Sequence, residues 1–233
     1  MLKVANLSIR FPVSEGYIEP VKELFLYLEQ NEILAVIGPS GCGKTVLCTA
    51  LLGMLEYPGF VHSGEITFSP QSGTSLDLLR LSEKEWQKLR GKTISLIFQN
   101  PVQALNHSWT IGSQFIETIR SHNPKTSKQE CLAMAEDMLD KVLFNKPRNI
   151  LRMYPFELSG GMGQRVIIAM ALVHHPALLI ADEPTTALDM RSESEVLRLL
   201  QQIREIYHTA ILLVSHDTRV LSRIADRTLA MAY

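Results

Sequence analysis

The chain carries the octapeptide Gly38-Pro39-Ser40-Gly41-Cys42-Gly43-Lys44-Thr45. It matches G-x-x-x-x-G-K-[ST] at every fixed position, a pattern in which a glycine-rich loop holds phosphate groups. The run Glu32–Ile37 before it predicts a strand covered on both faces, and Lys44–Leu55 after it predicts a helix. This strand–loop–helix context favours a phosphate-binding loop over a glycine-rich turn that matches by chance.

The residues of this loop indicate what it can bind. Backbone N–H groups from Gly41 to Thr45 would surround a β-phosphate, helped by the dipole of the helix that begins there. Lys44 would place its ammonium on the β- and γ-phosphates, and the Thr45 hydroxyl would be a ligand of Mg²⁺. The loop therefore predicts a site for a nucleoside triphosphate with its metal ion.

Two acids end a second predicted buried strand, Leu178–Ala181. Asp182 is suited to hold Mg²⁺ through water, and Glu183, one residue further, to polarise an attacking water. Two acids at the exit of a strand are common by themselves. Their assignment to a catalytic site therefore depends on their pairing with the phosphate loop.

Polar side chains follow two further predicted strands. Gln99 comes after Thr93–Phe98, and its amide could reach the metal ion or the water. His216 comes after Ile211–Val214 and could form a hydrogen bond with a γ-phosphate. Each has an ordinary alternative, because a glutamine at a strand end is usually solvated and a single histidine there is usually a structural hydrogen-bonding residue.

A second glycine-rich segment lies far downstream and reads Leu158-Ser159-Gly160-Gly161-Met162-Gly163-Gln164-Arg165. The apolar residues after it predict a helix whose first turn carries the serine and glycines. The amino terminus of such a helix can bind a phosphate. We expect this turn to grip a triphosphate from the side opposite the first loop, with a second copy of the chain closing around the nucleotide.

Composition limits the class of protein. The chain has 233 residues, of which 46% are hydrophobic, enough to bury one core with a smaller lobe. A formal net charge of -1 gives no general attraction to nucleic acid. The three cysteines have no paired spacing, which suits a reducing compartment. No apolar run approaches the ~20 residues that span a bilayer.

The hydrophobic pattern changes along the chain. Alternation in residues 5–11, with apolar positions in 24–28 and 66–68, predicts an antiparallel β lobe. Capping boxes at Ser82 and Ser127 begin predicted helices. From Gly161 onwards, helices alternate with strands, which implies a parallel sheet covered on both faces.

We therefore expect one α/β domain over residues 1–233. Residues 1–99 would form the β lobe and the part of the core that holds the phosphate loop. Residues 100–158 would form a helical subdomain, and residues 159–233 the rest of the core.

The order of these segments carries a resemblance to a known family. The phosphate loop, Gln99, the turn at Ser159, Asp182-Glu183, Ala187-Leu188-Asp189 and His216 follow one another as in ATP-binding cassette (ABC) ATPases. The chain resembles that family over essentially its whole length. The resemblance implies a P-loop NTPase fold with a RecA-like parallel-sheet core, an antiparallel β lobe and a helical signature subdomain.

The resemblance also implies roles for residues outside the phosphate loop. Ser159, Gly160 and Gly161 would lie across a dimer interface and complete the nucleotide site of the partner. Asp189 would lie in the loop that links the two sites. An aromatic residue usually stacks on adenine in this family, and both Tyr17 and Phe11 are candidates, with Tyr17 favoured.

A narrower resemblance depends on the segments Ile97-Phe98-Gln99-Asn100-Pro101, Ala104-Leu105-Asn106 and Tyr154-Pro155-Phe156-Glu157. They are similar to the ATPases of importers for dipeptides, oligopeptides and nickel, although His107 stands where a proline is expected. This implies ATP and Mg²⁺ as ligands and a second ABC ATPase, identical or similar, as partner. It also implies two integral membrane permease subunits, an extracytoplasmic solute-binding protein and a peripheral location at the cytoplasmic face of the cell membrane.

Two other functions stay open at this point. A soluble ABC-type ATPase that acts on DNA or ribosomes usually carries long coiled coils, zinc insertions or tandem cassettes, and the sequence has none of these. A catalytically silent binding module is opposed by the intact Lys44, Glu183 and His216.

His174 and His175 close a predicted helix, where a cation would suit the helix dipole.

Overall fold

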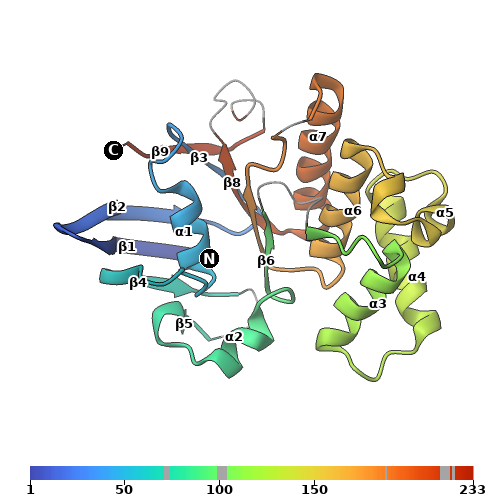
Figure 1. The fold of residues 1–233 in the computed structure, drawn as a ribbon, viewed down its shortest axis with the longest axis horizontal. Coiled ribbons are helices and arrows are strands. Elements are labelled where there is room, and N and C mark those ends of the chain that lie inside the picture. Colours follow the sequence, from blue (N-terminus) through green and yellow to red (C-terminus); the bar gives the residue numbers. More distant parts are fainter. Residues whose placement is uncertain (71–73, 99–103, 187, 216–220, 222–223, 233) are drawn as a thin grey trace.

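The computed structural model describes residues 1–70, 74–98, 104–186, 188–215, 221 and 224–232. Within them the chain forms two sheets, and helices cover both faces of the second sheet (Figure 1). In this described part, no helix combines the length and the apolar character needed to cross a membrane.

The first sheet is antiparallel and has the strand order β2-β1-β4-β5. Leu2 and Val4 of β1 are buried, whereas Lys3 between them is exposed. Leu2 pairs with Leu28 and Val4 with Leu26 on the neighbouring strand, so one face of the sheet is apolar. This confirms the expected antiparallel β lobe. Its strands are β1 (Leu2–Val13), β2 (Gly16–Leu28), β4 (Phe60–Phe68) and β5 (Leu76–Asp77).

The second sheet is parallel and has the strand order β6-β7-β8-β3-β9. Along β3, Ile33 and Ala35 belong to one hydrophobic cluster, and Leu34 and Val36 belong to another on the opposite face. Because both faces are buried, these strands read as continuous apolar runs. The strands are β3 (Ile33–Ile37), β6 (Ile94–Ile97), β7 (Leu178–Asp182), β8 (Ala210–Ser215) and β9 (Arg227–Ala230).

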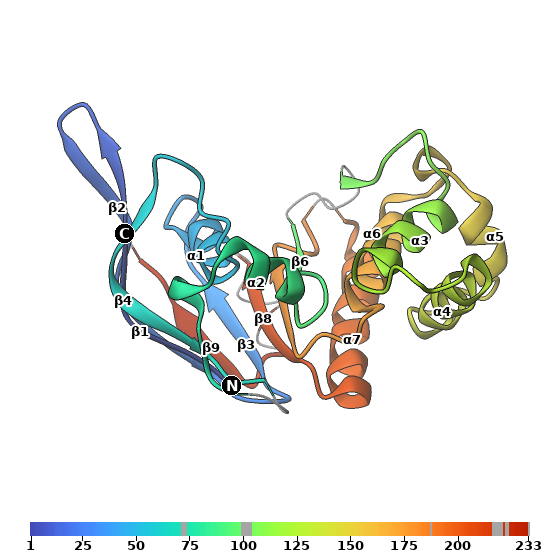
Figure 2. The same ribbon diagram turned by 90° about the horizontal axis from the view of Figure 1, so that it is seen from below.

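The helices divide between the two faces of the parallel sheet. Helix α1 lies on the face toward the antiparallel sheet, and α6 and α7 lie on the other face (Figures 1 and 2). Helices α3, α4 and α5 pack on one another and, through α3 and α4, on α6. The helices are α1 (Lys44–Leu51), α2 (Glu83–Leu89), α3 (Ile111–His122), α4 (Lys128–Lys141), α5 (Pro147–Arg152), α6 (Gly160–Leu172) and α7 (Met190–Tyr207).

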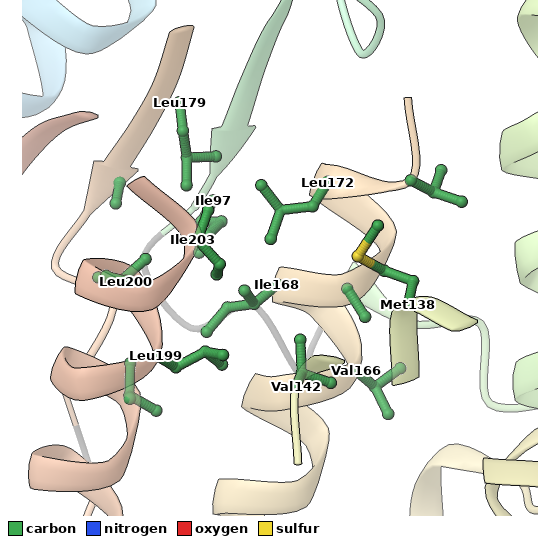
Figure 3. Close-up of a cluster of buried hydrophobic side chains, with 14 of the residues drawn as sticks. Ile97, Met138, Val142, Val166, Ile168, Leu172, Leu179, Leu199, Leu200 and Ile203 are labelled. Carbon is green, nitrogen blue, oxygen red and sulfur yellow. The ribbon is translucent and has the colours of Figure 1, made fainter. Parts of the chain in front are cut away.

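The position of α6 is set by packing on both sides. Figure 3 shows Ile168 and Leu172 of α6 between Leu200 and Ile203 of α7 on one side and Met138 of α4 on the other. All of these side chains are nearly or fully buried. Because interiors are close-packed, α6 is held as a rigid support for the glycine-rich turn at its start.

Helix α1 is shorter than the sequence predicts. It ends at Leu51 rather than Leu55, because Gly53 has φ +60 and turns the chain out of the helix. The N–H of Gly53 donates to the carbonyl of Ala50, and the N–H of Met54 donates to that of Thr49. These two bonds form a Schellman motif, which satisfies the last carbonyls of the helix.

We expected a cation to suit the segment at His174 and His175. For His175 this expectation is wrong. Helix α6 ends at Leu172, and the ring of His175 stacks on that of Tyr207, with 4.7 Å between centroids. Burial lowers the pKa of His175, and the charge of Lys141 acts in the same direction. The neutral imidazole is therefore favoured here.

Candidate nucleotide site

The phosphate loop joins β3 to α1, as the sequence predicts. Gly41 has φ +83 and Gly43 has φ +97, a conformation that residues with a side chain rarely adopt. A Cβ on Gly43 would also overlap the backbone carbonyl of Pro20 in β2. The loop is thus pressed against the antiparallel sheet, and glycine is required where the two meet.

Lys44 is the first residue of α1 and is 5% exposed. Its Nζ donates to the carbonyl oxygens of Gly38 at 2.9 Å and Pro39 at 2.8 Å. The backbone of the loop therefore holds the ammonium inside the ring of residues 38–44. A phosphate placed in this loop would meet a positive charge together with the N–H groups at the start of α1.

Asp182 ends β7 and is 4% exposed. Burial raises the pKa of this carboxyl group, and a hydrogen bond from Thr45 opposes the change. Among the described residues, Oδ1 of Asp182 is buried without a hydrogen-bond partner. A buried carboxylate oxygen without a partner beside a threonine hydroxyl suits Mg²⁺, which takes oxygen ligands and compensates the charge. Thr45 and Asp182 could thus hold a magnesium ion.

Glu183 begins the loop after β7 and has φ +49, which is unusual for a residue with a side chain. Its N–H donates to the carbonyl of Val214 in β8 at 2.9 Å, and Oε2 accepts a hydrogen bond from Oγ1 of Thr186 at 2.8 Å. Strained backbone of this kind is found where surrounding contacts impose it and often at functional sites. These bonds hold the carboxylate at the carboxyl end of the sheet.

The phosphate loop and Glu183 line the same cavity, which has a volume of about 230 Å³. It is smaller than the usual pocket for a whole small-molecule ligand, which starts at about 300 Å³. Its size suits phosphate groups rather than a complete nucleotide. The residues that line it are Pro20, Ser40, Gly41, Gly43, Lys44, Thr45, Val46 and Glu183.

The second glycine-rich segment lies elsewhere. Ser159 caps α6, and its Oγ accepts a hydrogen bond from the N–H of Met162 at 3.3 Å. Ser159 and Gly160 are exposed, and the signature turn (Ser159–Gly161) does not contribute to the 230 Å³ cavity. Figures 1 and 2 both show α6 apart from α1, with strands of the parallel sheet between them. Within one chain the two glycine-rich segments therefore face different places.

Asp189 caps the next helix, α7. Its Oδ1 accepts hydrogen bonds from the N–H groups of Arg191 and Ser192, both at 3.0 Å. Its Oδ2 accepts one from the Ser192 hydroxyl at 2.7 Å. The hydrogen bonds from Ser192 lower the pKa of Asp189. The carboxylate is therefore kept ionised and is oriented by its own helix.

Neither aromatic candidate for adenine lines the cavity. Tyr17 is 60% exposed at the tip of the β1–β2 hairpin and contacts the ring of Phe60 edge-on, with 5.9 Å between centroids. The ring of Phe11 fills the space beside Gly59, where a Cβ would collide with it. The choice between Tyr17 and Phe11 stays a prediction. Gln99 and His216 lie outside the described residues, so their roles stay predictions as well.

The structure adds three residues that the sequence analysis did not single out. Pro20 covers Gly43, Thr186 binds Glu183, and Ser192 binds Asp189. The two hydroxyl residues stand three positions after their acids, a spacing that is typical of local side-chain bonds. No local signal could have found Pro20, because it comes from another strand.

These features define a class of protein. A phosphate loop between a buried strand and a helix, with two acids at the end of a parallel strand, is the site of a P-loop nucleotide-binding domain.

The family follows from comparison with known proteins. A family model described as ABC transporter matches residues 21–186, and the chain belongs to this family. The Oligopeptide transport ATP-binding protein OppD of Bacillus subtilis (strain 168) is 39% identical over 232 residues. The Glutathione import ATP-binding protein GsiA of Salmonella typhimurium is 40% identical over 232 residues. The matches cover 99% of this chain but 63% of OppD and 37% of GsiA, so the chain spans less than two thirds of the length of either relative.

Solved structures confirm the ABC cassette fold. The dimeric structure of MJ0796, a bacterial ABC transporter cassette, has a TM-score of 0.84 at 25% identity and covers 100% of this chain and 94% of that one. CbiO1 from Clostridium perfringens, part of the ABC transporter complex cbiONQ, has a TM-score of 0.80 at 26% identity, covering 99% and 84%. The parallel sheet, the antiparallel sheet and the helices therefore have the arrangement implied by the resemblance.

Proposed function

We propose that the chain binds ATP with Mg²⁺ and hydrolyses it as the energising subunit of an ABC importer. The observation that carries this proposal is the convergence of Lys44, Thr45 and Glu183 on one phosphate-sized cavity, with the buried carboxyl group of Asp182 beside Thr45. Each of these residues has the chemistry that phosphoryl transfer to water requires.

The roles of the residues follow from their positions. Lys44 and the N–H groups of the loop would bind the β- and γ-phosphates, and Thr45 and Asp182 would hold the metal ion. Bound Mg²⁺ would neutralise charge on the phosphates. Glu183 orients the attacking water and accepts its proton. The hydrogen bond from Thr186 keeps the Glu183 carboxylate in one orientation.

The complete site requires a second protomer. The exposed signature turn of one chain is suited to bind the γ-phosphate held by the loop of another, because it lies at the amino terminus of α6, where the first N–H groups of a helix have no partner within the helix. The dimeric structure of MJ0796 supports such a pairing, and a related structure of that cassette is described as a post-hydrolysis state bound to ADP and Pi. We infer a homodimer or a pair with a similar ABC ATPase.

The transported cargo is inferred from relatives. The names of OppD and GsiA refer to oligopeptides and glutathione, which favours a peptide cargo over the nickel or metal chelates that the resemblance also allows. The chain would then work at the cytoplasmic face of the membrane, on two permease subunits. An extracytoplasmic solute-binding protein would deliver the peptide.

The proposal can be tested with the chain and its natural companions. We expect the chain to co-purify with two multi-span membrane proteins and, in vesicles, to hydrolyse ATP faster when a peptide-loaded solute-binding protein is present. Lys44→Ala should abolish this hydrolysis. Co-purification with nucleic acid or ribosomes, or the absence of hydrolysis from the intact complex, would contradict the proposal.

A further inference from the structure

The signature turn and the start of α7 meet at one close contact. A Cβ on Gly161 would lie 2.9 Å from Oγ of Ser192 and 3.2 Å from its Cβ, so the turn has no room for a side chain there. A Cβ on Gly160 would lie 3.8 Å from Cδ2 of Leu188, in ordinary contact. The loop that holds Asp189 is thus packed directly against the signature turn.

Ser192 binds Asp189 through its hydroxyl as well as through its backbone N–H. The N–H groups of Arg191 and Ser192 both donate to Oδ1 of Asp189, which already caps α7. The hydroxyl supplies a bond to the other oxygen, Oδ2, at 2.7 Å. Bonds to both oxygens fix the plane of the carboxylate, and the atom that does so is also the one facing Gly161.

We propose that Ser192 is a positioning residue, whose hydroxyl locks the Asp189 loop against the signature turn and so sets the geometry that this turn presents to a second protomer. This inference depends on the proposed function, in which the turn completes the site of a partner. The same loop begins at Glu183, the proposed base of the chain's own site, which Thr186 holds in the same hydroxyl-to-carboxylate manner. Ser192 therefore stands where a change near one site can reach the other.

Amide exchange in the isolated chain gives a test that does not need ATP. Ser192→Ala should cause a loss of protection at the N–H groups of Met162 and Gly163, which donate to Ser159. Ser194→Ala is the matched control, because the Ser194 hydroxyl binds the carbonyl of Met190 in the same helix and not Asp189. Unchanged protection in Ser192→Ala would overturn the proposal.

Mixed dimers test whether Ser192→Ala affects the nucleotide site of the partner rather than that of its own chain. Lys44→Ala in one protomer leaves one working site, made from the loop of the other protomer and the signature turn of the Lys44→Ala protomer. Ser192→Ala should lower kcat about 10-fold when it is in the protomer that supplies the turn, since a misplacement of about 1 Å can cost about 100-fold. The loss of kcat should be smaller when Ser192→Ala is in the protomer that supplies the loop, and KM for ATP should change little in either mixed dimer.

The conservative variant separates positioning from simple loss of stability. Ser192→Thr keeps the hydroxyl and should restore most of kcat, whereas equal losses in the two mixed dimers would contradict the proposal. If the chain pairs with a different ATPase, two assemblies are compared. In one, the companion carries the change of its phosphate-loop lysine; in the other, this chain carries Lys44→Ala. Absence of hydrolysis in every wild-type assembly would refute the proposed function, and amide exchange would still decide the role of Ser192.

Discussion

The hydroxyl of Thr186 donates a hydrogen bond to Oε2 of Glu183, with 2.8 Å between the two oxygens. The backbone of Glu183 has φ +49 and is tied to Val214 of the neighbouring strand. The acid is therefore held twice, once through its backbone and once through its carboxylate. This arrangement suits a proposed general base, because proton transfer needs a fixed donor–acceptor geometry.

Removal of this hydroxyl should slow hydrolysis without weakening nucleotide binding. We expect Thr186→Ala to lower kcat about 10-fold, because the Glu183 carboxylate loses its orientation, while KM for ATP stays nearly constant. Steady-state phosphate release measures both constants. Thr185→Ala, one residue earlier, is the control and should hydrolyse ATP at the wild-type rate; an equal loss in the two variants would argue against orientation by Thr186.

Glu183 itself should be separable from binding. Glu183→Gln keeps the size of the side chain but cannot accept a proton, so hydrolysis should slow by roughly 10²–10⁴-fold. Equilibrium binding of ATP should be retained, because Lys44 and the loop are unchanged. Normal turnover in this variant would mean that another group activates the water.

Substitutions at two glycines distinguish the effect of backbone strain from that of a steric clash. Gly16 has φ +109 with no atom within 4 Å of its would-be Cβ, whereas a Cβ on Gly43 would overlap the carbonyl of Pro20. Gly16→Ala should lower the free energy of unfolding by about 1–2 kcal/mol and leave ATP binding intact. Gly43→Ala should cost more and abolish ATP binding. Urea unfolding and a binding titration check the pair, and retained binding in Gly43→Ala would contradict the packing of β2 on the loop.

Helix α7 offers a matched pair for the core. Ile203 is 3% exposed and contributes to the cluster in Figure 3, whereas Ile206 on the same helix is 59% exposed. Ile203→Ala should lower the free energy of unfolding by about 2–5 kcal/mol through lost burial and the cavity left behind. Ile206→Ala should change it by less than about 0.5 kcal/mol. Similar losses in both variants would show that α7 is not packed as described.

Acid should lower the free energy of unfolding through His122. The ring of His122 meets that of His174 edge-on, with 5.1 Å between centroids. Burial, and then the charge of His174, lower the pKa of His122; Lys92 acts in the same direction, and a hydrogen bond with the backbone of Arg90 opposes them. The unfolded chain thus binds this proton more tightly than the folded one. The contribution of His122 to the free energy of unfolding is fully present above its pKa in the unfolded chain, about 6.5. It is lost as the pH falls through the pKa of His122 in the folded chain.

The corresponding variant is His122→Gln. It should reduce the loss in free energy of unfolding between about pH 7 and about pH 5, measured by urea denaturation. An unchanged pH dependence in His122→Gln would contradict the assignment.

Local patterns predicted the elements that carry the site. The run before Gly38 became β3, the residues after the loop became α1, and Asp182 closes a fully buried strand. Period and composition specify such elements, because each depends on neighbours only a few residues away. The same reasoning missed the end of α1, where a left-handed Gly53 ended the helix although apolar residues continued.

The sequence by itself determined the strand–loop–helix unit, the acids at the end of β7, the helix start at the second glycine-rich segment and the family resemblance, which the comparisons confirm. Only the tertiary structure brought Pro20 onto Gly43, tied Glu183 to Val214 and placed Ser192 against Gly161. These contacts join residues far apart in the chain. They depend on strand order and on how α6 and α7 pack, and close packing of whole elements, rather than local preference, sets those distances.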